Sequence, residues 1–164
     1  MWNKYWIGID NGVTGGIGLI EHGGTSVFYA PMPTKKCLNY TKAKQITTRI
    51  KRESLLALLK PISKDSVCFI ERPMINPMRW KASVSAIRAL ECTQGVLEEL
   101  QIRYEFKDSK EWQKVLLPSG LAGEELKFAS LEVGKRLFPR LDFSQFKDAD
   151  GLLIAEYCRR MHML

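Results

Sequence analysis

Residues 5–22 read YWIGIDNGVTGGIGLIEH, and this stretch decides the fold that the sequence predicts. It contains two apolar, strand-like runs, Tyr5 to Asp10 and Gly16 to His22, and a third run from Thr25 to Ala30 follows directly. An Asn-Gly step comes after the first run and a Gly-Gly step after the second, and both favour tight turns between antiparallel strands. The chain is therefore expected to open with a three-stranded antiparallel meander.

Two later runs extend this sheet. Ser66 to Glu71 (SVCFIE) is almost wholly apolar, as is typical of a strand buried on both faces, and it follows a predicted helix from Thr41 to about Lys60. A strand after a helix favours parallel pairing with an earlier strand. A second helix, from about Arg79 to Leu100, precedes a last strand from Ile102 to Phe106. The sequence thus predicts an α/β fold: a mixed five-stranded sheet, three antiparallel strands and then two parallel ones, flanked by helices.

The length of 164 residues, with 45% hydrophobic and 26% charged side chains, fits a single domain over residues 1–164. Three more helical stretches, 109–118, 124–138 and 149–161, complete it. The net charge of +7 comes from one segment, because residues 34–52 contain seven Lys and Arg and no acid. A concentrated basic segment favours an anionic partner such as nucleic acid or a membrane surface.

Scarce residue types exclude several kinds of site. The four cysteines form no C-x-x-C pair and there are two histidines, which argues against a structural zinc site and against Ser-His-Asp or Cys-His catalysis. The N-terminus lacks the apolar core of a signal peptide, and no run approaches the ~18 apolar residues of a membrane span. The sequence predicts a cytoplasmic protein without membrane contact, in which any hydrolysis depends on carboxylates and a metal.

Three carboxylates stand at the ends of apolar elements. Asp10 ends the first strand before a glycine-rich loop, Glu71 ends the buried strand, and Asp150 lies on the apolar face at the start of the last helix. Each also has an ordinary structural explanation. Asp10 suits a turn, Glu71 suits an ion pair with Arg72, and Asp150 suits the capping of a helix.

Asp10 and Glu71 are expected about 5 Å apart if their strands are parallel neighbours. Two carboxylates at that distance repel each other unless a cation lies between them. Oxygen-only ligands suit Mg²⁺, with Mn²⁺ able to substitute, rather than zinc. With Asp150 at the same edge of the sheet, the three acids predict a two-metal site.

Four segments together resemble the RuvC-like Holliday junction resolvases of the RNase H-like superfamily, in particular the compact, phage-type endonucleases. In chain order they are IGIDNGVTGGIG (residues 7–18), FIERP (69–73), SKEWQKVLLP (109–118) and DADGLLIAEY (148–157). The resemblance implies an RNase H-like fold and symmetric phosphodiester hydrolysis of a four-way DNA junction by a homodimer, through two Mg²⁺ ions. It also implies the cytoplasm of a bacterium or of a phage-infected host.

By the same resemblance, Asp10, Glu71 and Asp150 match the first, second and last metal-binding acids of the family. The family's last motif has two aspartates three residues apart, whereas Lys147 stands three before Asp150 here and the second acid, Asp148, stands two before. Positions two apart on an ideal helix point about 200° apart. Asp148 therefore joins the site only if the helix begins after it.

Exposed-looking basic and apolar residues near these acids are candidates for DNA binding. The loop 74–80 (MINPMRW) suits stacking on bases or wedging between them, and the lysines fall where the resemblance implies phosphate contacts. The alternatives are solvated surface lysines and a loop that buries its Met and Trp. The candidates are Arg72, Met74, Arg79, Lys81, Lys110, Lys114 and Lys127.

The helix from Arg79 to Leu100 carries small residues at spacings of three and four. A second helix can approach such a row closely, and an isologous dimer suits the two equivalent strands of a four-way junction. The row predicts either a homodimer interface or packing on the protein's own sheet. It consists of Ala82, Ser85, Ala86, Ala89 and Thr93.

Three other functions stay open. A nuclease of the same fold acting on another branched or hybrid substrate would carry the same acids. A nucleotide-binding domain of the actin, heat-shock-chaperone and sugar-kinase superfamily shares the D-x-G-x-T pattern of residues 10–14, although 164 residues supply only one of its two lobes. A catalytically inactive nucleic-acid-binding module is the third.

Overall fold

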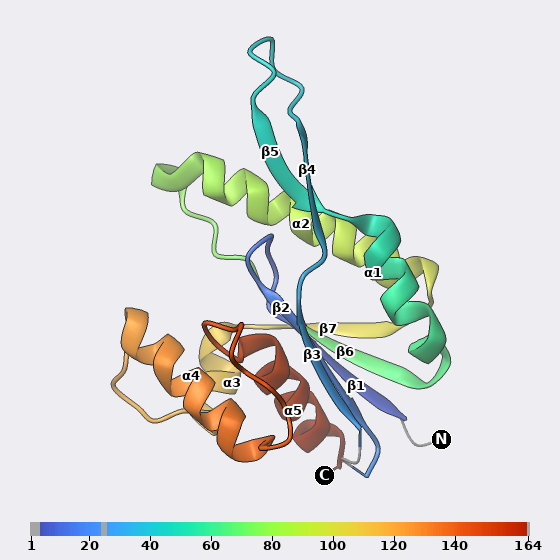
Figure 1. Cartoon of the computed structure of the whole chain (residues 1–164), viewed down its shortest axis with the longest axis vertical. Helices are drawn as coiled ribbons and strands as arrows, with labels where there is room; N and C mark the ends of the chain where they lie inside the picture. Colours follow the sequence, from blue (N-terminus) through green and yellow to red (C-terminus); the bar gives the residue numbers. More distant parts are fainter. Residues whose placement is uncertain (1–3, 24–25, 164) are drawn as a thin grey trace.

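A mixed five-stranded sheet forms the centre of the computed structural model, which describes residues 4–23 and 26–163 (Figure 1). The strands, in spatial order, are β3 (Val27–Pro31), β2 (Gly16–Glu21), β1 (Tyr5–Ile9), β6 (Ser66–Glu71) and β7 (Arg103–Lys107). β1, β2 and β3 pair antiparallel, whereas β6 pairs parallel with both β1 and β7. The predicted sheet is confirmed, and the expected start of the third strand at Thr25 lies outside the described residues.

Helices cover both faces of this sheet (Figure 1). They are α1 (Arg52–Leu59), α2 (Trp80–Glu99), α3 (Ser109–Leu116), α4 (Gly123–Leu137) and α5 (Asp150–Met163). α1 and α2 pack on one face with Ile7 and Cys68, and the other three pack on the opposite face with Trp6 and Val67. Consecutive strand residues belong to different halves of the core because their side chains alternate between the faces. Within the described part of the chain, no helix is long and apolar enough to cross a membrane.

The backbone of α5 lies directly against β1 and the start of β2, because glycines face each other there. A methyl group at Gly8 would stand 2.0 Å from the backbone nitrogen of Ala155, and one at Gly151 would stand 2.4 Å from the backbone oxygen of Gly16. Non-bonded atoms do not approach so closely, since carbon contacts are optimal near ~3.5–4 Å. Glycine at these positions therefore sets the distance between the helix and the sheet.

The helix predicted from Thr41 to Lys60 is wrong for its first half. Residues 34–50 instead form a hairpin of two antiparallel strands, β4 (Thr34–Leu38) and β5 (Ile46–Ile50). This hairpin projects beyond the body of the molecule, and α1 follows it (Figure 1). The basic segment of the sequence therefore lies on a projecting arm and on the start of α1.

The spacing of Ile46 and Ile50 explains the error. Residues four apart share one face of a helix, but they also share one face of a strand, where side chains alternate with a period of two. The β-branched Thr47 and Thr48 between them favour a strand. Lys44, in the turn, has a positive φ of 45°, which is incompatible with a continuous right-handed helix.

The row of small residues on α2 lies in two environments. Ala89 belongs to the core beneath the helix and Thr93 is fully buried, so this end of the row packs within the protein. Ser85 and Ala86 are half-buried and Ala82 is exposed. Packing on the protein's own sheet is therefore observed for the second half of the row, and its first half is accessible.

Candidate metal centre

Three aspartates lie together at one edge of the sheet. Asp10 directly follows β1, Asp150 is the first residue of α5, and Asp148 lies two residues before it. One carboxylate oxygen from each lies within 4.8 Å of the other two, and all three residues are half-buried. The structure thus brings together three of the four acids that the sequence indicated.

Asp148 belongs to the cluster because of where α5 begins. The helix starts at Asp150, so Asp148 lies outside it and is not bound by helical geometry. Its Oδ1 accepts a hydrogen bond from the backbone N–H of Asp150, with the two atoms 3.3 Å apart. From the sequence, Asp148 is expected to join the site only if the helix begins after it, and α5 does begin after it.

Glu71 ends β6 at the same edge but is not one of the three clustered residues. Ile9 pairs with Ile70 across the parallel strands, so Asp10 and Glu71 are the next residues of the two chains. Oε2 of Glu71 accepts a hydrogen bond from Nε1 of Trp112 on α3, 2.7 Å away. Because Trp112 is fully buried, this bond fixes the direction of the Glu71 carboxylate.

The acids oppose one another's negative charge. Burial, followed by the charges of the neighbouring acids, raises the pKa of Asp10 well above its ordinary value. Burial and then the charge of Asp148 raise the pKa of Asp150 to about 7. Burial also raises the pKa of Glu71, although the hydrogen bond from Trp112 acts in the opposite direction. Carboxylates in such a site take up protons unless a cation offsets their charge.

The donor set fits a hard divalent cation. The cluster consists of carboxylate oxygens alone, which suit Mg²⁺ or Mn²⁺ better than zinc. The charge of Lys127 lowers the pKa of Asp10 and Asp150, but the net pKa shift of both aspartates stays upward. A single nearby lysine thus leaves the repulsion largely in place, and a cation bound among the oxygens would relieve it.

Two hydroxyl groups orient the aspartates, and no sequence pattern indicated either of them. Ser130 on α4, which is fully buried, donates a hydrogen bond to Oδ1 of Asp150 and accepts one from the backbone N–H of Ala149 at 3.1 Å. The hydroxyl of Tyr29 on β3 donates to the backbone oxygen of Asp148 at 3.3 Å. Tyr29 and Asp148 are 119 residues apart, so no local pattern links them.

The seven predicted DNA-binding residues, Arg72, Met74, Arg79, Lys81, Lys110, Lys114 and Lys127, are all exposed. Two of them have acidic neighbours: Nε of Arg72 lies 3.3 Å from Oδ1 of Asp108, and Nζ of Lys127 lies 3.8 Å from Oε1 of Glu124. Since Lys127 also lowers the pKa of two of the clustered aspartates, it lies within electrostatic reach of the candidate metal centre.

The loop between β6 and α2 exposes its large apolar side chains. The exposed fractions are 83% for Met74, 91% for Met78 and 70% for Trp80. The side chain of Asn76 accepts a hydrogen bond from the backbone N–H of Met78, and Ser83 bonds the backbone of Asn76. The alternative in which this loop buries its Met and Trp is therefore wrong.

Comparison with known proteins defines the fold. No protein-family model and no curated protein matches this chain. The structure is similar to that of Thermus thermophilus RuvC in complex with a Holliday junction substrate, with a TM-score of 0.64, 14% sequence identity and 96% of each chain covered. A second Thermus thermophilus RuvC structure matches with a TM-score of 0.59, again at 14% identity and 96% coverage of each chain. The mixed sheet, its flanking helices and this full-length similarity show that the chain has the RuvC fold, of the RNase H-like type.

Proposed function

We propose that this protein is a metal-dependent endonuclease that resolves four-way DNA junctions by hydrolysing phosphodiester bonds at symmetric positions. The proposal depends above all on three half-buried aspartates whose oxygens lie within 4.8 Å of one another, on a fold shared with a junction-binding protein. Uncompensated buried charges are costly to a folded protein. The presence of the three aspartates is explained if they hold the metal that phosphodiester hydrolysis uses.

Asp10, Asp148 and Asp150 would hold Mg²⁺ or Mn²⁺, with Glu71 available to a second ion. Two bound ions supply an activated water and stabilise the leaving oxygen. The protein's own residues fix the ligand geometry, since Trp112 restrains Glu71 through a 2.7 Å hydrogen bond. Burial raises the pKa of Asp150, and the hydrogen bond from Ser130 opposes that rise and so favours the charged form that a metal needs.

Branched DNA would bind across the surface around the aspartates. Exposed cations bind phosphates, and the exposed methionine is suited to packing against bases. The proposed contacts are Arg72, Met74, Arg79, Lys81, Lys110, Lys114 and Lys127. We assign Ala82 and Ala86 of the α2 row to a homodimer interface. We assign the protein to the cytoplasm of a bacterium or of a phage-infected host.

The decisive experiment incubates the protein with a labelled four-way junction, a duplex and an RNA–DNA hybrid, each with and without Mg²⁺. We expect paired nicks in the junction only when Mg²⁺ is present. Asp10→Asn, Glu71→Gln and Asp150→Asn should each lower cleavage by at least ~10²-fold, because a ligand of the reacting metal is lost, while junction binding persists. Asp65→Asn is the matched control, since Asp65 precedes β6 at the opposite edge of the sheet.

Other results would identify the competing functions. Preferential cleavage of the hybrid would indicate a nuclease with a different substrate, and ATP turnover in the same tubes would indicate a nucleotide-binding domain. Junction binding without cleavage would indicate an inactive binding module. Full activity of Asp10→Asn would refute the metal mechanism.

The homodimer is tested separately by sedimentation. Ile87, which is 43% exposed on α2, lies beside the accessible half of the small-residue row. If that surface is the interface, wild-type protein sediments as a dimer at micromolar concentration and Ile87→Glu sediments as a folded monomer. A wild-type monomer that still makes paired cuts would exclude a stable free dimer.

A further inference from the structure

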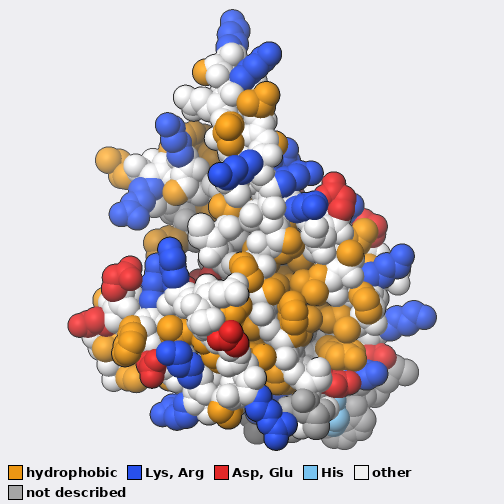
Figure 2. Space-filling view, in the orientation of Figure 1, with side chains coloured by type: hydrophobic (Ala, Val, Ile, Leu, Met, Phe, Trp, Pro, Cys, Tyr) orange, Lys and Arg blue, Asp and Glu red, His pale blue; other side chains and the backbone are white. Residues whose placement is uncertain are grey.

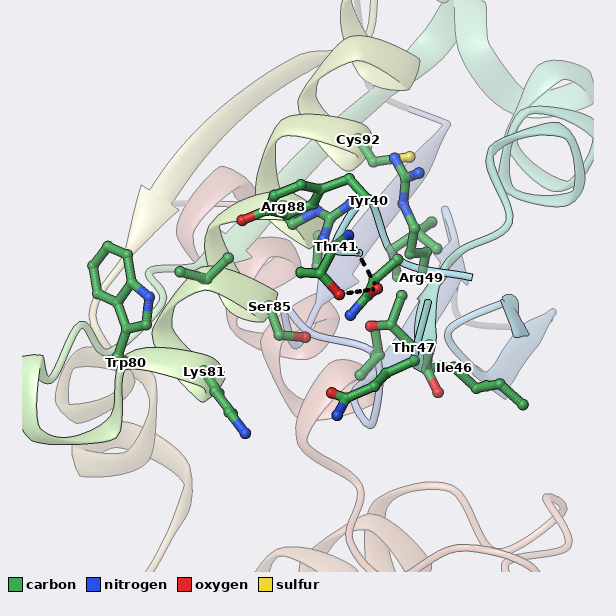
Figure 3. Close-up of a pocket in the computed structure, with 17 residues that line it drawn as sticks. Tyr40, Thr41, Ile46, Thr47, Arg49, Trp80, Lys81, Ser85, Arg88 and Cys92 are labelled. Carbon is green, nitrogen blue, oxygen red and sulfur yellow. Dashed lines mark hydrogen bonds between the residues drawn. The ribbon is translucent and has the colours of Figure 1, made fainter. Parts of the chain in front are cut away.

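A groove of about 510 Å³ separates the projecting hairpin from α2 (Figure 3). One wall is β5 with the hairpin tip, and the other is the first half of α2. This volume is typical of sites for small ligands and leaves room for about one or two nucleotides, not for a double helix. The groove is therefore sized for a single extended chain.

Both walls of the groove are basic. Arg49 contributes from the hairpin, and Lys81 and Arg88 contribute from α2 (Figure 3). The residues that line the groove include no Asp or Glu. Among the described residues, none of these three cations forms an ion pair, so their charge is available to an anion.

The hairpin beside the groove carries further uncompensated charge. Lys35 pairs with Glu53 and Arg52 pairs with Glu99, whereas Lys42 and Lys44 at the tip have no acidic partner among the described residues. Figure 2 shows Lys and Arg side chains over the projecting arm with few acids between them. The arm therefore attracts a polyanion toward the groove.

Two large aromatic side chains stand at the groove with their rings in solvent. Tyr40 at the hairpin tip is 89% exposed and Trp80 at the start of α2 is 70% exposed. Exposed aromatics next to cations provide stacking surfaces for unpaired bases, and each stacked base adds to the affinity. The basic lining and the exposed aromatics together favour a nucleic-acid strand as the occupant of the groove.

The groove is continuous with the loop of the metal centre. Val13, three residues after Asp10, lines it. In the same loop, Nδ2 of Asn11 donates a hydrogen bond to the backbone oxygen of Ala86 on α2, 3.2 Å away. A chain lying in the groove would therefore lead toward the aspartates.

We propose that this groove binds a single DNA strand, with phosphates on Arg49 and Arg88 and bases on Tyr40 and Trp80, and guides that strand to the metal centre. The proposal rests on the proposed nuclease function for the identity of the strand as part of a branched DNA. The groove thus adds a strand-binding surface to the contacts around the aspartates.

The test compares two variants that each lose two positive charges. Arg49→Gln/Arg88→Gln removes the groove cations, and Lys60→Gln/Lys64→Gln removes two exposed lysines from the segment before β6, at the far edge of the sheet. Binding of a fluorescent oligothymidine and of a labelled four-way junction is measured by anisotropy over a range of salt, without added metal. The groove variant should bind oligothymidine about tenfold more weakly or worse, with a salt slope smaller by about 1.4 units, and the control should match wild type.

A second variant keeps the test independent of folding. Tyr40→Ala changes a side chain that packs on almost nothing, and it should still weaken oligothymidine binding because a stacking surface is lost.

Binding should also quench tryptophan fluorescence in wild type, and Trp80→Phe should lose that quenching. Equal quenching in wild type and Trp80→Phe, or equal salt slopes in the groove variant and the control, would overturn the proposal.

Two further outcomes distinguish this proposal from a dimer contact in the groove and from the proposed nuclease function. If the groove instead holds a second copy of the chain, the groove variant changes from dimer to monomer in sedimentation while its salt slope stays that of wild type, which overturns the proposal. If the groove variant loses strand binding but wild type cuts no DNA, the groove is confirmed as a strand-binding site and the proposed nuclease function is refuted.

Discussion

Nε1 of Trp112 lies 2.7 Å from Oε2 of Glu71, so a fully buried indole donates a hydrogen bond to a carboxylate beside the candidate metal centre. Trp112 packs in the half of the core that α3, α4 and α5 form with the sheet. The bond therefore connects the orientation of one candidate metal ligand to the packing of that half of the core.

Trp112→Phe should impair cleavage while the protein stays folded. The substitution keeps an aromatic ring and removes the N–H donor, so Glu71 loses its restraint. Removing a group that orients a metal ligand lowers metal affinity or activity by about 10–100-fold. Cleavage rates measured over a range of Mg²⁺ concentration should show both a lower rate and a higher Mg²⁺ requirement.

Trp6→Phe is the control for this variant. Trp6 lies in the same half of the core, but its Nε1 is buried without a hydrogen-bond partner among the described residues. Its replacement should leave the Mg²⁺ requirement unchanged. Equal effects of the two substitutions would assign the loss to packing and not to the hydrogen bond.

Mg²⁺ should raise the melting temperature of the wild-type protein. A ligand at 100 times its Kd stabilises the folded state by about 2.7 kcal/mol, or roughly 5–10 °C for a domain of this size. Asp10→Asn should lose this response and, without metal, should melt above wild type because one repelling charge is gone. Calorimetry with and without Mg²⁺ measures both effects, and an equal response of the two proteins would place the metal elsewhere.

Lys127→Ala should weaken junction binding and make that binding less dependent on salt concentration, whereas Lys135→Ala should have neither effect. Both lysines lie on α4 near a glutamate three residues earlier, Glu124 and Glu132 respectively, so the two variants are closely matched. Lys127 alone of the pair influences the clustered aspartates. If it contacts one phosphate, the salt slope of binding falls by about one unit. The same slope in both variants would make Lys127 an ordinary surface residue.

Glu156→Gln should destabilise the fold in a manner that depends on pH. Glu156 is 3% exposed and accepts hydrogen bonds from Arg159 and Arg160. Burial raises the pKa of this carboxyl, but the hydrogen bonds from the arginines outweigh it, so the pKa is lowered from 4.5. A lowered pKa in the folded state gives stability that is present above the unfolded value and is lost as pH falls through the folded value.

The expected cost of Glu156→Gln at pH 7 is about 1–2 kcal/mol, because the arginines are partly exposed and solvent screens the pairs. Thermal melts of wild type and variant should converge as the pH is lowered below 4.5, the ordinary value for this carboxyl. A constant difference between their melting temperatures from pH 7 down to pH 3 would contradict this account.

The sheet and the acids were predictable because each depends on local pattern. Apolar runs with glycine turns predict strands, and a carboxylate at the end of a buried strand has few structural uses. Once β1 and β6 are parallel neighbours, Asp10 and Glu71 must lie at the same edge. The position of Asp148 needed one further fact, the residue at which α5 begins.

The hairpin and the orienting side chains were not predictable in this way. A stripe with a spacing of four is common to a helix and a strand, so Ile46 and Ile50 did not distinguish them. Ser130 and Trp112 lie on helices whose sequences predict only an inward face. Their partners are 20 and 41 residues away, and tertiary packing alone brings these groups together.

The contact of Gly8 and Gly151 with neighbouring backbone has a consequence for experiments that sample many substitutions at once. In a library selected for DNA cleavage, both positions should retain glycine as strictly as positions 10 and 150 retain aspartate, since any β-carbon would push α5 from the sheet. Neither glycine carries a reactive group. Substitutions at the two glycines, which set only the distance between two backbones, should therefore be as rare in such a library as substitutions at the acids.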